Sequence, residues 1–147
     1  MTEQLHDPLP MLPGYALRRA ASAWAAELNT RMATIDLRQS EASVLVLIGA
    51  NPGVTAAALG RQLDIQRANM VPLLKRLEEA GLIERAPIDG KSQGLALSAP
   101  GQERMAAARA IIDDYEADLL ARVPAPHRPH LLPALTALWR WGPMLPN

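Results

Sequence analysis

The segment that most constrains the fold is the run TAAALGRQLDIQRANMVPLLKRLEEAGL, from Thr55 to Leu82. Thr55 is placed to cap a short helix over residues 56–62, and Leu63-Asp64-Ile65 indicates a turn. A second helix is expected from about Arg67 to Ala80, ended by Gly81. Two helices joined by a turn of three to four residues form a helix-turn-helix.

A β-hairpin is expected directly after this segment. Residues 83–86 predict one strand and residues 94–97 the returning strand, and the polar loop between them holds an Asp89-Gly90 turn signal. A hairpin in this place is called a wing. Ser98 is expected to cap the long helix that follows, with Pro100 in its first turn.

The remainder of the chain is expected to be helical. Ala and Leu make up a third of the 147 residues, and both favour helix. Apolar spacing predicts helices over residues 14–34 and 39–50, the long helix to about Val123, and a last helix ending near Trp141. The three prolines in residues 1–13 predict a loosely ordered arm.

These elements predict a mostly α (α+β) fold, a winged helix-turn-helix with a two-stranded wing and long terminal helices. The expected parts are an arm and dimerisation helix over 1–36, a DNA-binding domain over 37–98 and C-terminal dimerisation helices over 99–147. The long helices cannot bury their apolar residues against so small a centre, which favours a homodimer.

Basic residues gather in the helix-turn-helix although the formal net charge of the chain is zero. Arg61, Arg67, Lys75 and Arg76 stand against Asp64, a local surplus of three positive charges that predicts phosphate binding. The second helix is expected to turn polar Arg, Asn and Gln side chains outward, which are the types that read base edges. Its outer residues are expected to be Gln66, Arg67, Asn69, Met70, Leu73 and Arg76. The shared core is expected to hold Leu59, Leu63, Ile65, Val71, Leu74 and Leu77.

The chain resembles the MarR (multiple-antibiotic-resistance regulator) family of winged helix-turn-helix transcription factors from roughly Leu12 to Trp139. The resemblance rests, in order, on LRRAASAWAAELN, NPGVT, ALGRQLDIQRANMVPLLKRLEEAGLIER, Asp89-Gly90-Lys91 and LALSAPGQE. Lys91 stands where the family commonly has Arg, and Ser98 replaces the common Thr. Lysine binds as a point charge without the two-pronged guanidinium of arginine, which predicts weaker wing binding or a weaker preference for A·T tracts.

The resemblance implies a recognition helix, residues 66–80, in the major groove and a wing tip in the minor groove of double-stranded DNA. It implies that Lys91 reaches the minor groove and that Asp89 orients Lys91 or holds the wing. The expected DNA-binding residues are Thr55, Gln66, Arg67, Asn69, Met70, Leu73, Lys75, Arg76, Asp89 and Lys91. A small phenolic or anionic effector is also implied, near Leu17, Trp24, Met32, Val44, Ile48 and Ile112.

Other chemistries find little support in the residues. The absence of cysteine excludes disulfides, thiolate metal sites and a Cys nucleophile, and no other nucleophile motif appears. His127 and His130 lack further ligands, so we expect no metal, no cofactor and no enzyme. No signal peptide or membrane span is apparent, which favours the cytoplasm. The alternative hypothesis is a helical dimeric ligand- or protein-binding module without an operator, which a flat salt dependence of DNA binding would support.

Overall fold

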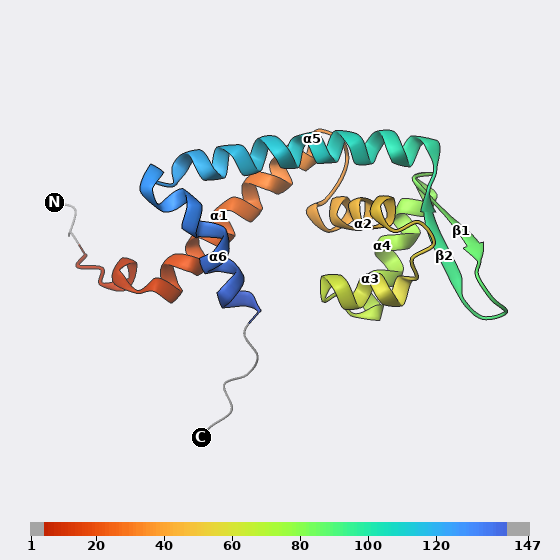
Figure 1. The fold of residues 1–147 in the computed structure, drawn as a ribbon, viewed down its shortest axis with the longest axis horizontal. Helices are drawn as coiled ribbons and strands as arrows, with labels where there is room; N and C mark the ends of the chain where they lie inside the picture. Colours follow the sequence, from red (N-terminus) through yellow and green to blue (C-terminus); the bar gives the residue numbers. More distant parts are fainter. Residues whose placement is uncertain (1–4, 141–147) are drawn as a thin grey trace, which may run out of the picture. The chain divides into compact units, whose positions relative to one another are not determined.

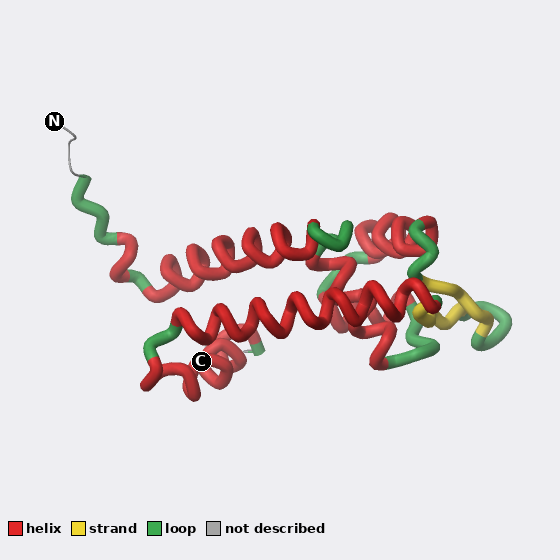
Figure 2. Tube along the Cα trace, turned by 90° about the horizontal axis from the view of Figure 1, so that it is seen from above, coloured by secondary structure: helices red, strands yellow, loops and turns green. Residues whose placement is uncertain are grey.

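The computed structural model describes residues 5–140, and its secondary structure is mostly helical with one small sheet (Figures 1 and 2). The elements are η1 (Leu9–Met11), α1 (Pro13–Ala33), α2 (Gln39–Ala50), α3 (Ala56–Leu63), α4 (Arg67–Glu79), β1 (Ile83–Pro87), β2 (Gln93–Leu97), α5 (Ala99–Arg122), η2 (Ala125–His127) and α6 (Arg128–Trp139). The predicted fold class is confirmed. The helix end expected near Trp141 lies outside the described residues.

The chain divides into two compact units, which meet between Ile112 and Asp113 within α5. The first unit holds α1 to α4, the sheet and the start of α5. The second holds the rest of α5 and α6. In the second unit, Arg128 donates from Nε to the Val123 carbonyl (2.8 Å) and from Nη2 to the Ala121 carbonyl (3.2 Å). These bonds satisfy carbonyls that the end of α5 would otherwise leave unpaired.

The helix-turn-helix is held by the local signals that its sequence carries. Thr55 Oγ1 accepts the Ala58 N–H (3.2 Å) and caps α3 as predicted. Gly81 ends α4 with φ of 71°, a left-handed conformation that suits glycine. The Leu82 N–H donates to the Leu77 carbonyl (3.0 Å) and the Gly81 N–H to the Glu78 carbonyl (2.9 Å), which is a Schellman motif.

The sheet is an antiparallel hairpin, with Ile83 opposite Leu97 at one end of the pairing and Pro87 opposite Gln93 at the other. Its inner edge is extended by Val54, which forms a bridge to Leu95. The Leu95 N–H donates to the Val54 carbonyl (2.8 Å), so the turn before α3 is tied directly to the wing.

A single apolar core joins the elements of the first unit. Its largest fully buried side chains come from the end of α1, from α2, α3 and α4, and from β2: Met32, Val44, Leu45, Ile48, Leu59, Leu74, Leu77 and Leu95. Because α2 contributes three of them, both the helix-turn-helix and the wing pack against α2. No helix in the described part of the chain has the length and apolar character needed to span a bilayer.

Candidate nucleic-acid interface

The two faces of α4 are set by one apolar stripe. Met70, Leu74 and Leu77 recur at spacings of four and three residues and are all buried. At 100° per residue, the opposite face is centred near Pro72 and Ala68, and Lys75 and Val71 lie toward one flank of it. All four of these residues are exposed, and Val71 has 57% of its surface accessible.

This orientation corrects two sequence predictions. Met70 was expected to face DNA, but it is only 2% exposed and packs in the core. Val71 was expected in the core and instead lies on the outer face. The two residues are adjacent and both apolar, so either could have begun the buried stripe. Leu73, also predicted to face DNA, is half-buried at the edge of the stripe.

The N-terminal end of α4 presents polar groups to solvent. Gln66, at the N-cap, makes no side-chain cap hydrogen bond, and its side chain is exposed together with those of Arg67 and Asn69. Within the described residues, Arg67 has no ion-pair partner. Lys75 lies on the same outer face, 3.8 Å from the exposed Glu79 carboxylate, a distance at which the pairing is weak.

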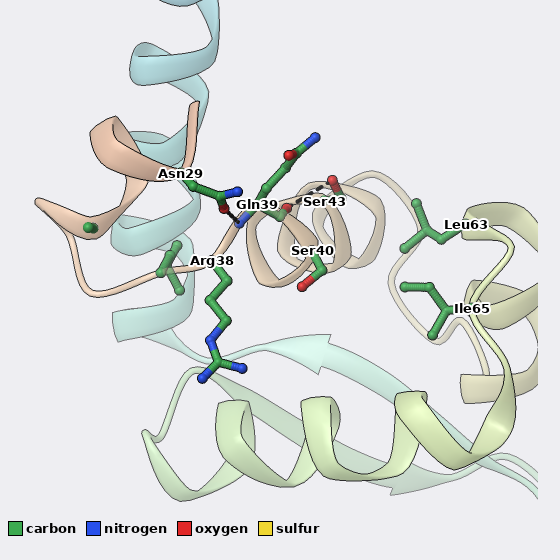
Figure 3. Close-up of a pocket in the computed structure, with 9 residues that line it drawn as sticks. Asn29, Arg38, Gln39, Ser40, Ser43, Leu63 and Ile65 are labelled. Atoms are coloured by element: carbon green, nitrogen blue, oxygen red, sulfur yellow. Dashed lines mark hydrogen bonds between the residues drawn. The ribbon is translucent and has the colours of Figure 1, made fainter. Parts of the chain in front are cut away.

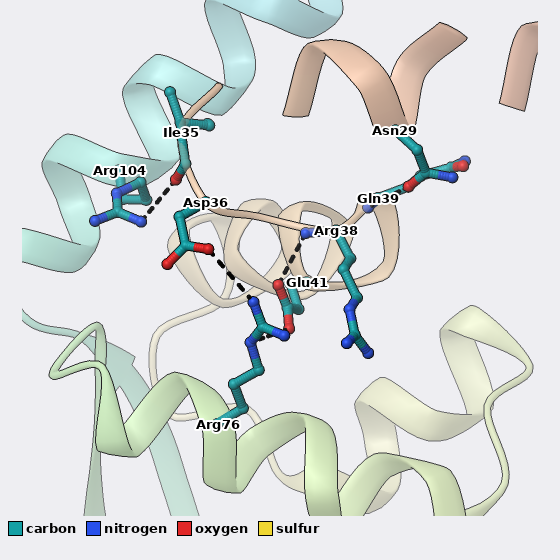
Figure 4. Close-up of polar contacts among 8 residues, drawn as sticks. All are labelled: Asn29, Ile35, Asp36, Arg38, Gln39, Glu41, Arg76 and Arg104. Atoms are coloured by element: carbon teal, nitrogen blue, oxygen red, sulfur yellow. Dashed lines mark hydrogen bonds and ion pairs between the residues drawn. The ribbon is translucent and has the colours of Figure 1, made fainter. Parts of the chain in front are cut away.

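Arg76 differs from these residues in its partners. Its guanidinium Nε lies 2.9 Å from Glu41 Oε1 on α2, and its Nη2 lies 3.7 Å from Asp36 Oδ1 in the α1–α2 corner. Figure 4 shows the side chain rising from α4 toward this corner. Two carboxylates of the same unit thus hold Arg76, whose side chain keeps 43% of its surface exposed, and its expected contact with DNA stays a prediction.

The wing tip is organised by Asp89. Its Oδ1 accepts the N–H groups of Lys91 (2.9 Å) and Ser92 (2.8 Å), and the Ile88 N–H donates to the Ser92 carbonyl (2.9 Å). The Lys91 and Ser92 N–H groups, in that order, hold the pKa of Asp89 below its ordinary value. Of the two roles expected for Asp89, this geometry is that of holding the turn. The Lys91 side chain is exposed.

A hollow of about 720 Å³ lies beside the α1–α2 corner (Figure 3). Its lining combines polar side chains of α1, the α1–α2 loop and the start of α2 with apolar ones from α1, that loop, the end of α3 and the turn after it: Asn29, Ala33, Leu37, Arg38, Gln39, Ser40, Ser43, Leu63 and Ile65. The Gln39 N–H donates to Asn29 Oδ1 (3.1 Å) at its edge. Arg38 makes no ion pair within the described residues.

The six residues predicted to surround an effector do not line this hollow. Met32, Val44 and Ile48 are completely buried in the core of the unit, and Leu17 is exposed on α1. The prediction favoured apolar residues, whereas the hollow is bounded mostly by polar groups at the start of α2. Among residues 5–140, no cluster of three or more His, Asp or Glu side chains could hold a metal ion.

Comparisons with known proteins agree with this arrangement. A family model described as MarR family matches residues 35–92. The HTH-type transcriptional repressor Rv2887 of Mycobacterium tuberculosis is 29% identical over 126 residues, which are 84% of this chain and 89% of that protein. Its structure in complex with salicylic acid is 25% identical, covers 94% of this chain and 99% of its own, and has a TM-score of 0.69.

The transcriptional repressor CouR bound to a 23-mer DNA duplex is 32% identical, covers 95% of this chain and 100% of its own, and has a TM-score of 0.83. CouR bound to p-coumaroyl-CoA is 30% identical over the same shares, with a TM-score of 0.81. The likeness thus extends over nearly the whole chain and includes the helix-turn-helix and the wing. The chain belongs to the MarR family of transcriptional regulators, which bind DNA and are not enzymes.

Proposed function

We propose that the protein is a repressor that binds a pseudo-palindromic operator as a homodimer. One α4 enters the major groove of each half-site, the half-sites lie about 34 Å apart, and each wing reaches the adjacent minor groove. The observation that carries this proposal is the N-terminal end of α4, where Gln66, Arg67 and Asn69 are exposed together. Arginine suits guanine, and asparagine and glutamine suit adenine, in the major groove.

The homodimer is supported by apolar surface on the terminal helices. Leu12 and Leu17, at the start of α1, are roughly half exposed. On α6, Leu132, Leu138 and Trp139 expose more than half of their surface. Large exposed apolar side chains that recur along a helix mark an interaction surface, and a second copy presents the same surface in return. The N- and C-terminal helices are therefore the proposed dimer contacts.

The experiment is a selection of duplexes from a random DNA pool by the full chain, followed by affinity measurements at several salt concentrations. We expect an enriched inverted repeat and an affinity that falls steeply with salt, because bound phosphates release counterions. Failure to enrich any sequence, with a flat salt response, would overturn the proposal and favour the ligand- or protein-binding alternative.

Arg67→Ala tests base reading at the proposed interface. We expect this variant to lose about 1–3 kcal/mol of binding free energy for the specific duplex if the guanidinium forms a bidentate hydrogen bond with guanine. Arg122→Ala, at the end of α5, removes the same charge from an exposed side chain outside α4 and serves as the matched control. Equal losses on the selected duplex and on a scrambled duplex would assign Arg67 to phosphate instead.

The proposed effector is an aromatic carboxylate that occupies the hollow beside α2. Arg38 supplies a cation without an ion-pair partner in the described residues, and Leu37, Leu63 and Ile65 supply apolar contact. Salicylic acid in the Mycobacterium tuberculosis relative supports an aromatic carboxylate, and p-coumaroyl-CoA bound to CouR, which is a thioester, supports only the aromatic part. Salicylate is the probe: we expect it to weaken operator binding roughly fivefold or more. Arg38→Gln, which keeps the backbone N–H that caps α2, should remove that response.

A further inference from the structure

Glu41 is the one charged side chain that is buried among the residues that the structure describes, with 2% of its surface exposed. A buried carboxylate is costly unless it is paired and hydrogen-bonded. Both of its oxygens have partners: Oε2 accepts the Arg38 N–H (2.8 Å), and Oε1 lies 2.9 Å from Arg76 Nε. The first contact caps α2, and the second joins α2 to α4.

The corner that receives Arg76 is itself tightly held. Asp36, the second partner of Arg76, has φ of 54°, a left-handed conformation that is uncommon for a residue other than glycine. The Arg104 Nη1 group of α5 donates to the neighbouring Ile35 carbonyl (2.7 Å). Figure 4 shows Arg76 and Arg104 approaching this corner from different helices. Arg76 thus pairs with the buried carboxylate of Glu41 and with the exposed carboxylate of Asp36, whose backbone belongs to this corner.

The position of Arg76 along α4 determines how its contact with Glu41 affects the exposed N-terminal end of the helix. Arg76 lies nine residues after Arg67, which corresponds to about 13 Å along a helix. The exposed polar side chains are at the N-terminal end, and the pair with Glu41 is in the last turn. If α4 rotates about its anchored C-terminal end, the side chains at its N-terminal end therefore move by an amount proportional to this separation.

We propose that Arg76 is a positioning residue for DNA recognition, which orients α4 through the buried Glu41 and contacts no base or phosphate. The inference rests on the proposed role of α4 in the major groove. It assigns to Glu41, a residue on a different helix and sealed from solvent, a part in operator affinity.

The variant Glu41→Gln separates the two explanations, because simple attraction to DNA and the positioning role predict opposite changes in DNA affinity. Glu41→Gln removes a negative charge from the unit, so attraction to DNA alone would leave binding unchanged or tighten it. Loss of the charged partner of Arg76 would instead release α4 and weaken binding. Glutamine keeps an acceptor for the Arg38 N–H, because glutamine serves in a capping box as glutamate does. The variant therefore keeps the cap of α2 and alters the pair with Arg76.

The experiment measures affinity for the selected operator duplex, over a range of salt concentrations, with the full chain and its variants. We expect Arg76→Ala to bind about tenfold more weakly with an unchanged salt slope, and Glu41→Gln to lose roughly threefold or more. The double variant should bind no more weakly than Arg76→Ala, since both changes break one contact. Arg67→Ala is the matched arginine control, and Arg76→Lys should recover part of the loss.

The inference is overturned if Glu41→Gln binds as tightly as the wild type, or if Arg76→Ala makes the salt slope shallower by about two, as loss of one phosphate contact in each protomer of the dimer would. If circular dichroism shows that Arg76→Ala does not fold, Glu41→Gln and Arg76→Lys give the same decision. A wild-type chain that selects no duplex contradicts the proposed function itself. A wild type that binds its operator while Glu41→Gln is unaffected contradicts only the role of Arg76.

Discussion

Replacing Gly101 with alanine should destabilise the first unit of the chain, although the change adds only one methyl group. Gly101 lies in the first turn of α5, and a Cβ atom there would stand 1.8 Å from the carbonyl oxygen of Leu82, just before β1. Real Cβ atoms essentially never approach within 3.0 Å, so the backbone of α5 or of β1 must move. A flexible side chain could yield, but a carbonyl group in a sheet connection cannot do so cheaply.

The expected loss in the free energy of unfolding can be estimated from the hydrogen bonds around Gly101. The Ser98 N–H donates to the same Leu82 carbonyl (3.0 Å), and the Gly101 N–H donates to Ser98 Oγ (3.0 Å). Each is worth about 1 kcal/mol, and overpacking a close contact costs typically about 1–3 kcal/mol. Alanine returns about 0.5–1 kcal/mol as the better helix former. The expected net loss in the free energy of unfolding is about 2–4 kcal/mol.

Thermal unfolding followed by circular dichroism, at one fixed protein concentration, measures this loss. For a chain of this size, we expect Tm to fall by about 5–15 °C. Gly90→Ala is the control, because its added Cβ meets no atom within 4 Å, and its Tm should stay within about 2 °C of the wild type. A Gly101→Ala protein that melts with the wild type would refute the close approach of α5 to Leu82.

Three further predictions concern the DNA-facing surface. Lys91→Ala should weaken binding to all duplexes alike and make the salt slope shallower by about two, one contact in each protomer of the dimer, as filter binding at several salt concentrations would show. Because Val71 is exposed on α4, replacing operator thymines with deoxyuridine should weaken the wild type and leave Val71→Ala unaffected, if valine contacts a thymine methyl group. Because the pKa of Asp89 is lowered, its stabilisation of the wing is complete above the ordinary aspartate pKa of about 4 and is lost as pH falls through the lowered value. The Ser92 amide resonance should move over that range in the wild type and not in Asp89→Asn.

Features set by neighbouring residues could be predicted from the sequence. The bounds of α2, residues 39–50, match the expectation, and so do the caps by Thr55 and Ser98. The end of α4 at Gly81 was also evident. Each of these signals acts over three or four residues, through one side chain and the backbone it caps, so no knowledge of the tertiary fold is needed.

Features that depend on distant partners could not be predicted in the same way. Met70 and Val71 are equally plausible core residues until α2 and α3 are placed against α4. Glu41 stands at an ordinary N3 position of a capping box, and nothing near it in the sequence shows that Arg76 covers it. The hollow was also missed, because its polar lining comes together only when the end of α1 meets the start of α2.

The pairing of Arg76 changes the salt dependence that the chain should show. Apart from Arg85, which pairs with Glu78, the exposed basic residues of the helix-turn-helix and wing that remain available for phosphate are Arg61, Arg67, Lys75 and Lys91. Four phosphate contacts per protomer, or eight per dimer, give a slope of log affinity against log salt of at most about −7. Ten contacts, with Arg76 included, would give about −9. A slope near −9 that falls to about −7 in Arg76→Ala would therefore refute the internal role of Arg76. If Arg76 is instead held by Glu41, we expect this chain of zero net charge to show a slope of about −7 or shallower, and Arg76→Ala should leave that slope unchanged.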